Sequence, residues 1–181
     1  MLRLFLLSFH PLTHTLSFLY IAFVILRLAV STQYPIHVVI SASMAPAFFR
    51  GDILIISNNT DRIKVGDIPV VWFEDATLPM VHRAVKVVWG QRKDVNGDGS
   101  EEMKGSGEAN VEQFVLTKGD NSPIDDVALY PWGQKFVYRE QIIGVVKWYV
   151  PWLGWPAIWL QETPYLKIGL LGILIGVGLL F

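Results

Sequence analysis

The sequence contains no cysteine. This absence excludes a thiol nucleophile, a thiolate-bound metal and any disulfide, so covalent catalysis has to use another side chain. The chain has 4 histidines, and they are scattered along its 181 residues without the close spacing that metal ligands need. We therefore expect neither a metal site nor a cofactor.

An excess of positive charge is also absent. The chain has 15 Lys and Arg against 16 Asp and Glu, which gives a formal net charge of -1 at pH 7. Proteins that bind nucleic acid present a basic surface, so no nucleic-acid partner is expected. Hydrophobic residues make up 52% of the chain, which is high for a soluble domain and indicates that part of it contacts a lipid bilayer.

One apolar segment lies near the N-terminus. Residues 15–30 are apolar apart from Ser17 and Arg27, and as a helix they cover about 24 Å of a hydrocarbon core roughly 30 Å thick. With residues 12–14 and the long side chain of Arg27, which can reach the headgroups, this segment predicts a transmembrane anchor. A cleavable signal peptide is the alternative, because Arg3 precedes the apolar run and Ala29-Val30-Ser31 offers small residues after it.

A second apolar segment, residues 168–181, covers only about 21 Å as a helix and is short for a span. It fits a locally thinned bilayer or a surface of partner helices. Aromatic rings crowd the Pro- and Gly-punctuated stretch before it: Trp148, Tyr149, Trp152, Trp155 and Trp159. Because Trp and Tyr prefer the headgroup level, we predict a membrane-facing surface here, with an ordinary aromatic core cluster as the alternative.

Between these segments the apolar runs are short and β-branched, which is typical of strands. They occupy residues 37–40, 53–56, 70–73, 81–89, 114–117 and 142–148, separated by Gly, Pro, Asn and Asp. The predicted fold is therefore mainly β, with an anchor in residues 1–32, a β domain in residues 33–150, and a Trp-rich interface segment with a short apolar helix in residues 151–181.

Residues 91–110 are a polar, glycine-rich insertion in the predicted β domain. The pattern Asp94-x-Asn96-x-Asp98-Gly99 imitates the start of an EF-hand loop. Gly105 stands where that loop needs a bidentate Glu, so we predict a solvated loop and no calcium site.

The segment Ser-Ala-Ser-Met-Ala-Pro, residues 41–46, stands between two predicted strands. Pro46 fixes its own φ angle and keeps Ala45 out of the helical region, and Gly51 permits backbone angles that other residues resist. The chain around Ser43 is therefore bent and held. Ser43 becomes a candidate nucleophile if a base and an oxyanion donor lie within hydrogen-bond reach.

His82 is the candidate base, with a packed strand histidine as the structural alternative. The candidate acids are Asp120, Asp125 and Asp126. Asp120 can equally cap a turn beside Gly119, and Asp125 and Asp126 point to opposite faces of an extended chain, so only one of that pair reaches His82. The Ser41 hydroxyl and the Ser43 amide are candidate oxyanion donors, with simple turn hydrogen bonding as the alternative for Ser41.

Taken in order, these motifs resemble the type I signal peptidases. The match consists of Ser-x-Met-x-Pro with Arg-Gly-Asp close behind, then Val-His-Arg, then Thr-Lys-Gly-Asp-Asn with Asp-Asp and Leu-Tyr downstream. His82 stands where most bacterial members carry a lysine base, so the resemblance is to the endoplasmic reticulum form. Ala45, at a position that is usually acidic in eukaryotic members, and the long insertion 91–110 depart from the pattern.

The resemblance implies a membrane-bound serine endopeptidase that removes signal peptides, with small residues at positions −1 and −3, from secretory and membrane preproteins. It implies Ser43 as nucleophile, His82 as general base, Asp126 as orienting acid and Asp120 as an essential supporting acid. It also implies a single-pass protein of the endoplasmic reticulum membrane with its β domain in the lumen, and other membrane subunits of a signal peptidase complex as partners. In that location Asn58, in Asn-Asn-Thr, is a glycosylation candidate.

Two further functions remain open at this point. One is a prokaryotic Ser-His signal peptidase at the plasma membrane, and the other is a non-catalytic β domain that binds apolar segments without cutting them. A soluble autoprotease repressor is not expected, because no helix-turn-helix pattern or basic face precedes the β domain.

Overall fold

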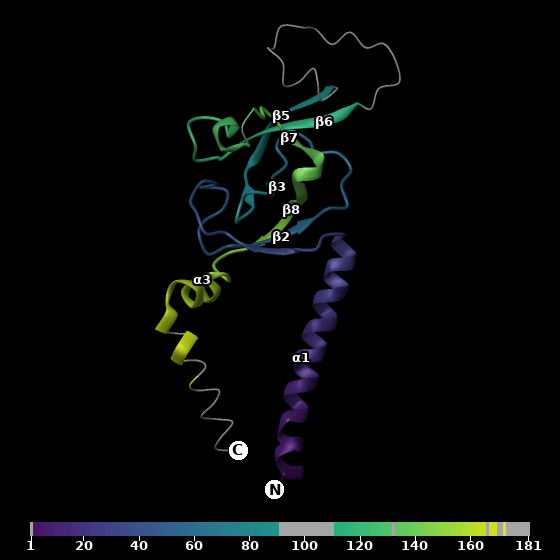
Figure 1. The fold of residues 1–181 in the computed structure, drawn as a ribbon, viewed down its shortest axis with the longest axis vertical. Helices are drawn as coiled ribbons and strands as arrows, with labels where there is room; N and C mark the ends of the chain where they lie inside the picture. The colour runs from purple at the N-terminus through teal and green to yellow at the C-terminus, as the bar shows by residue number, and fades with distance from the viewer. Residues whose placement is uncertain (1, 91–110, 132, 166, 170–171, 173–181) are drawn as a thin grey trace.

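The computed structural model describes residues 2–90, 111–131, 133–165, 167–169 and 172, with side chains from residue 13 onward. It confirms the predicted fold class, since a long N-terminal helix leads into a mainly β domain. Helices α1 (Leu2–Val30) and α3 (Trp155–Glu162) extend from one end of that domain, and strands β5 and β6 lie at the other end (Figure 1). The predictions for residues 91–110, and most of those for residues 168–181, fall outside the described residues.

Helix α1 begins earlier than the apolar run from which it was predicted. Its window Thr13–Val30 has a mean hydropathy of 1.7 and is long and apolar enough to cross a membrane, with 0% of it buried against the rest of the protein. The last carbonyls of a helix have no partner within it. Here the Asn58 amide donates to the Val30 carbonyl over 2.8 Å, and the Asn59 side chain donates to the Ala29 carbonyl over 2.8 Å. The β domain thus caps the helix and is tied to it.

The strands form two antiparallel sheets. The five-stranded sheet has the order β1-β2-β8-β3-β4, and the three-stranded sheet has the order β5-β6-β7. Their bounds are β1 Ile36–Val38, β2 Ile53–Ser57, β3 Pro69–Val71, β4 Met80–Val81, β5 Arg83–Gly90, β6 Glu112–Lys118, β7 Val137–Tyr138 and β8 Ile142–Val150. Each predicted strand overlaps an observed one, but the run at 81–89 is divided between two sheets. His82 lies at that division.

The main core lies between the two sheets and takes residues from both. It is made of Ile63, Val71, Phe73, Ala84, Val115, Tyr130, Val137, Ile142 and Val145. A smaller cluster of Met44, Phe48 and Leu54 lies beneath the loop that carries Ser43. Burying two apolar side chains of that loop stabilises it by about 1.5–3 kcal/mol each, so the loop is packed rather than merely bent.

The end of the Ser43 loop is fastened to the segment that leads into α3. Asp52 is 2% exposed, and its carboxylate accepts from the Phe49 amide over 2.9 Å and from the Trp152 amide over 3.1 Å. Gly51 has a φ of 95°, and its carbonyl accepts from the Gly154 amide over 2.8 Å. The C-terminal segment therefore contacts the end of the loop that carries Ser43.

The aromatic stretch lies at the surface. Trp148, Trp152 and Trp159 are 73%, 73% and 57% exposed, so they are not part of the protein core. Helix α3, which was not predicted, begins with Pro156 in its first turn, where the missing N–H of proline costs nothing. The membrane-facing role of this surface stays a prediction.

We predict that Gly51→Ala loosens the contact between the Ser43 loop and α3. Its positive φ disfavours alanine by about 1–2 kcal/mol, and the added Cβ overlaps the Trp155 ring. Displacing that ring adds about 1–3 kcal/mol to the loss of stability. Thermal unfolding of the detergent-solubilised variant should therefore start at a clearly lower temperature than that of the native protein. Gly66→Ala is the matched control, because Gly66 has the same φ of 95° and nothing within 4 Å of its Cβ. Equal losses in the two variants would contradict the packing role of Gly51.

Candidate active site

Ser43 is presented by the loop between β1 and β2, and this loop is held on both sides of the serine. The Ala45 amide donates to the Ala42 carbonyl over 3.1 Å and the Phe48 amide to the Met44 carbonyl over 3.0 Å. From a distant part of the chain, the Asn121 amide donates to the Ser43 carbonyl over 2.9 Å. The Ser43 backbone is therefore fixed by its own turn and by the segment that carries the candidate acids.

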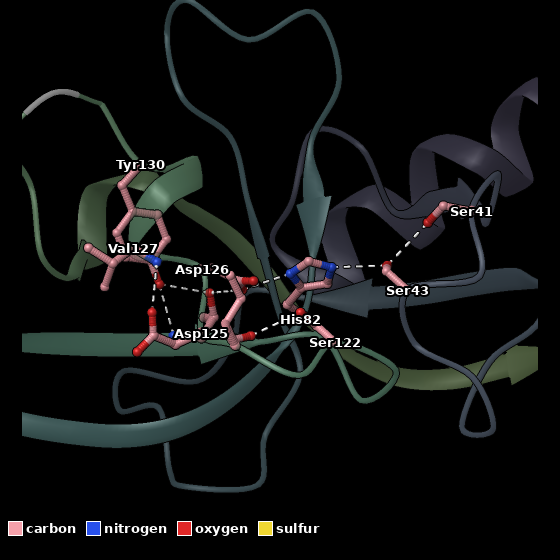
Figure 2. A network of polar contacts seen from close by, with 10 residues as sticks. Ser41, Ser43, His82, Ser122, Asp125, Asp126, Val127 and Tyr130 are labelled. Atoms are coloured by element: carbon pink, nitrogen blue, oxygen red, sulfur yellow. Dashed lines mark hydrogen bonds and ion pairs between the residues drawn. The ribbon is translucent and has the colours of Figure 1, made fainter.

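The structure brings Ser43, His82 and Asp126 into one hydrogen-bonded line (Figure 2). The Ser43 Oγ lies 2.9 Å from His82 Nε2, and His82 Nδ1 lies 2.7 Å from Asp126 Oδ2. The His82 and Asp126 side chains are 9% and 2% exposed. These are the distances and the order that a serine, a base and an orienting acid need.

The hydrogen-bond partners determine which nitrogen of His82 carries the proton. An ionised carboxylate only accepts, so Nδ1 donates to Asp126 and Nε2 is left to accept from the Ser43 hydroxyl. The Ser43 hydroxyl proton is thus committed to His82. The Ser41 hydroxyl, 3.1 Å from Ser43 Oγ, then donates to the serine oxygen.

The three candidate acids have different places. Asp126 alone of the three bonds to His82 in the described structure. Asp125 is exposed and accepts from the Val127 amide over 3.3 Å. Asp120 forms a bidentate ion pair with Arg83, the residue that follows His82, with N–O distances of 2.8 Å and 2.6 Å. The side-chain hydrogen bond from Arg83 lowers the pKa of Asp120, and the neighbouring charges of Arg83 and His82 act in the same direction.

Two buried residues near the acid, Thr117 and Tyr130, were assigned no role from the sequence, and of these Thr117 contacts the acid. The Thr117 hydroxyl donates to Asp126 Oδ2 over 2.7 Å, and the Thr117 amide donates to the Tyr130 hydroxyl over 2.9 Å. Burial raises the pKa of Tyr130, while its hydrogen bonds with Thr117 act the other way. The signal in the sequence was their place in the quoted motifs, because Thr117 begins Thr-Lys-Gly-Asp-Asn and Tyr130 ends Leu-Tyr.

Gly119 is a further residue that the motifs did not single out for the site. A Cβ on Gly119 would lie 2.8 Å from the Ser43 carbonyl oxygen and 3.2 Å from His82 Nε2. No side chain fits there without moving the serine or the imidazole. Gly119 therefore lets two distant parts of the chain approach at the reacting atoms.

A cleft of about 430 Å³ opens beside Ser43 and His82. Its walls are mainly apolar. They come from β1 with Val39 and Ile40, from Leu78 to Val81, and from the small cluster under the loop, and Gln161 of α3 also lines the cleft. His37 also lines it; burial lowers the pKa of its imidazole, and the bond between its Nε2 and the Tyr34 carbonyl acts against this. The Ser43 hydroxyl thus lies at the edge of a mainly apolar groove.

Other predicted features have definite places. Asn58 is half-buried at the junction of α1 and the β domain, and its side-chain oxygen accepts from Arg139 over 2.6 Å. Within the described ranges, no group of three or more His, Asp or Glu side chains is arranged to hold a metal ion. The glycosylation of Asn58 stays a prediction.

No protein-family model matches the chain. Among curated proteins, it is 39% identical over 176 residues to the signal peptidase complex catalytic subunit SEC11 of Zygosaccharomyces rouxii, covering 96% of this chain and 93% of that protein. It is 40% identical over 148 residues to the protein of the same name from Ajellomyces capsulatus, covering 81% and 75%. The match to that from Schizophyllum commune is 39% over 145 residues, covering 80% and 74%.

We predict that Asp120→Asn lowers thermal stability in a pH-dependent way. The pKa of Asp120 is lower in the folded protein than its usual value of about 3.9. Its pairing with Arg83 therefore stabilises the fold fully above about pH 3.9. This stabilisation is lost as the pH falls through the lowered pKa of the folded protein. Because the pair is partly solvated, we expect a Tm difference of about 1–3 °C at pH 6 that narrows below about pH 4.

The control for this prediction is the Arg83→Gln background. There Asp120 has lost its cation, so a further Asp120→Asn change should have little effect at any pH. The same Tm difference in both backgrounds would show that the ion pair is not its source.

Proposed function

The chain belongs to the family of signal peptidase complex catalytic subunits, and we propose that it cleaves peptide bonds as a serine endopeptidase of the signal peptidase I type. It is thus a peptidase that works within a signal peptidase complex. The observation that carries the proposed chemistry is the single hydrogen-bonded line from Ser43 through His82 to Asp126.

In the first half of the proposed reaction, Ser43 Oγ attacks the scissile carbonyl carbon while its proton passes to His82 Nε2. Asp126 stabilises the imidazolium that forms. His82 then gives this proton to the leaving amine, and the C–N bond breaks to leave an acyl ester on Ser43. In the second half, water attacks the ester with His82 again as base, which releases the peptide acid and restores the serine.

The negative charge that develops on the carbonyl oxygen needs donors in place before the reaction. We assign this role to the Ser43 amide and the Ser41 hydroxyl. Support for Ser41 comes from the distance of 3.1 Å between its Oγ and Ser43 Oγ, which places its hydroxyl beside the attacking atom. When the serine oxygen forms its new bond, the Ser41 hydroxyl is free to turn to the oxyanion.

The substrates we propose are preproteins whose signal peptides carry small residues at positions −1 and −3. The cleft supports this proposal because its walls are mainly apolar. β1 and β4, which flank the cleft, are also the two edge strands of the five-stranded sheet. An extended peptide can pair with such an edge while alternate side chains enter shallow pockets.

We propose that the protein lies in the endoplasmic reticulum membrane, with α1 as the described helix that can span it. We propose that the β domain lies on the lumenal side and that other membrane subunits of the complex pack beside it. The exposed Trp148 lies in β8, Trp152 in the turn after it and Trp159 on α3. Helix α3 extends from the same end of the domain as α1, which suits contact of this segment with headgroups (Figure 1). A non-catalytic scaffold is disfavoured, because binding alone does not require a base aligned with a serine.

The direct test is a preprotein cleavage assay on the complex purified in detergent. We predict that Ser43→Ala and His82→Ala each lower kcat by about 10⁴-fold or more, since the members of such a triad act as a unit. Unchanged copurification of the partner subunits is the control for assembly. Native turnover by Ser43→Ala would support the scaffold hypothesis and end the serine mechanism.

A second prediction separates the neighbouring carboxylates. Asp126→Asn should lower kcat by about 10⁴-fold, because an amide does not stabilise the imidazolium and can hold the wrong tautomer. Asp125→Asn is the matched control: its remaining oxygen still accepts from the Val127 amide, so kcat should change by about threefold at most. Greater damage from Asp125→Asn would show that the wrong acid has been assigned to His82.

A further inference from the structure

Asp126 is held by a buried hydroxyl pair that the catalytic line does not include. Thr117, at the end of β6, is 0% exposed, and Tyr130, just after the short helix η1 (Val127–Leu129), is 7% exposed. The Thr117 Oγ1 lies 2.7 Å from Asp126 Oδ2 and 2.9 Å from the Tyr130 hydroxyl. Thr117 therefore bonds directly to the acid that orients His82, and Tyr130 reaches it through Thr117.

The direction of each hydrogen bond follows from what the groups can donate. The Asp126 carboxylate only accepts, so the Thr117 hydroxyl proton goes to Oδ2. Thr117 Oγ1 must then accept from the Tyr130 hydroxyl. The Tyr130 oxygen in turn accepts from the Thr117 amide over 2.9 Å. Each hydroxyl proton in the group therefore has one acceptor. The last acceptor is Asp126 Oδ2, which also accepts from His82 Nδ1–H.

The group is also anchored in the fold. The Asp126 amide donates to the Thr117 carbonyl over 3.1 Å, which ties the two backbones together. The Tyr130 ring belongs to the main core and packs against Phe73 with ring centroids 5.8 Å apart. Figure 2 shows Tyr130 on the side of Asp126 away from Ser43. The position of Asp126 is thereby set by the packed core and not by the surface turn alone.

We propose that Thr117 and Tyr130 are positioning residues for the peptidase reaction: they fix the Asp126 carboxylate so that it accepts from His82 Nδ1–H and leaves Nε2 toward Ser43. This inference rests on the proposed serine mechanism. Neither residue lines the cleft, so their effect falls on turnover rather than on substrate binding.

Removing the Thr117 hydroxyl has two separable consequences. The carboxylate loses a donor that fixes its orientation, which lowers kcat. Its negative charge is also no longer shared between two donors and acts more strongly on His82, which favours the imidazolium, so the acidic limb of kcat/KM moves to higher pH. The other charged groups near His82 are Arg83 and Asp120, which pair with each other, and Asp125 and Tyr130 around Asp126; the variants leave the first three unchanged.

The test is a kinetic comparison of full-length variants in the purified complex, with a preprotein substrate across the pH range. Thr117→Val keeps the shape of the side chain and should lower kcat about 10–100-fold with KM within about twofold, since a hydrogen bond to a charged group is lost. Its acidic limb should lie about half a pH unit higher or more. Tyr130→Phe should show the same changes at about 3–10-fold in kcat, and Thr117→Ser, which restores the hydroxyl, should be within about threefold of native.

Thr32→Val is the matched control, because it removes another buried threonine hydroxyl bond, to the Ile143 carbonyl over 3.1 Å, away from Asp126. Its pH profile and kcat should be native even if its Tm falls as much as that of Thr117→Val. If Thr117→Val does not assemble, Tyr130→Phe and the Thr117→Ser rescue carry the test.

Native kcat and an unmoved acidic limb in both Thr117→Val and Tyr130→Phe would overturn the positioning role. So would equal losses in Thr32→Val. Ser43→Ala, assayed in parallel, separates this outcome from failure of the mechanism. If Ser43→Ala still cleaves the preprotein, the serine mechanism itself is wrong. If Ser43→Ala is inactive while Thr117→Val is fully active, only the positioning role is rejected.

Discussion

The hydrogen bond between His82 Nδ1 and Asp126 Oδ2 is the contact on which the arrangement of this protein depends. It is 2.7 Å long, and both side chains are almost completely buried. A buried carboxylate is costly unless its oxygens accept hydrogen bonds, so Asp126 is stable in its place only with its donors. One donor, His82, lies where the chain passes from one sheet to the other. The second donor, Thr117, lies near the end of β6. The packing of the two sheets and the chemistry of the site therefore stabilise each other.

A second constraint links the site to the end of the domain that carries the helices. The loop of Ser43 is fastened through Gly51 and Asp52 to the segment before α3, and the junction at Asn58 and Asn59 caps α1. Arg50 adds an ion pair with Glu162 at the end of α3. In the proposed function, a peptide that leaves the membrane beside these helices would therefore meet Ser43 at a position that these backbone contacts fix. Geometry of this kind reduces the entropy that a bound substrate must lose before it reacts.

Much of this was predictable from local sequence, and the failures have physical causes. The strands were found because short β-branched runs between turn residues form strands in most contexts. Strand β7 has two residues and no pattern to detect, and the division of the run at 81–89 depends on tertiary pairing. Alternation of side chains showed that only one of Asp125 and Asp126 reaches His82, but not which one, so that choice rested on resemblance. The contacts of Thr117 with Tyr130 join residues 13 apart and exist only after η1 has formed.

In the proposed mechanism, the pair of Arg83 and Asp120 leaves Asp126 as the carboxylate that bonds to the base. A free carboxylate next to His82 would share the imidazolium and offer its proton a second acceptor. Asp120 is instead held by two hydrogen bonds to Arg83, which compensate its charge and direct both of its oxygens away from that role. Arg83 also donates to the Gly66 carbonyl, so the cation is itself fixed. The donors to Asp126 in the described structure are His82 and Thr117. In the proposed mechanism, its charge is therefore available when His82 becomes an imidazolium.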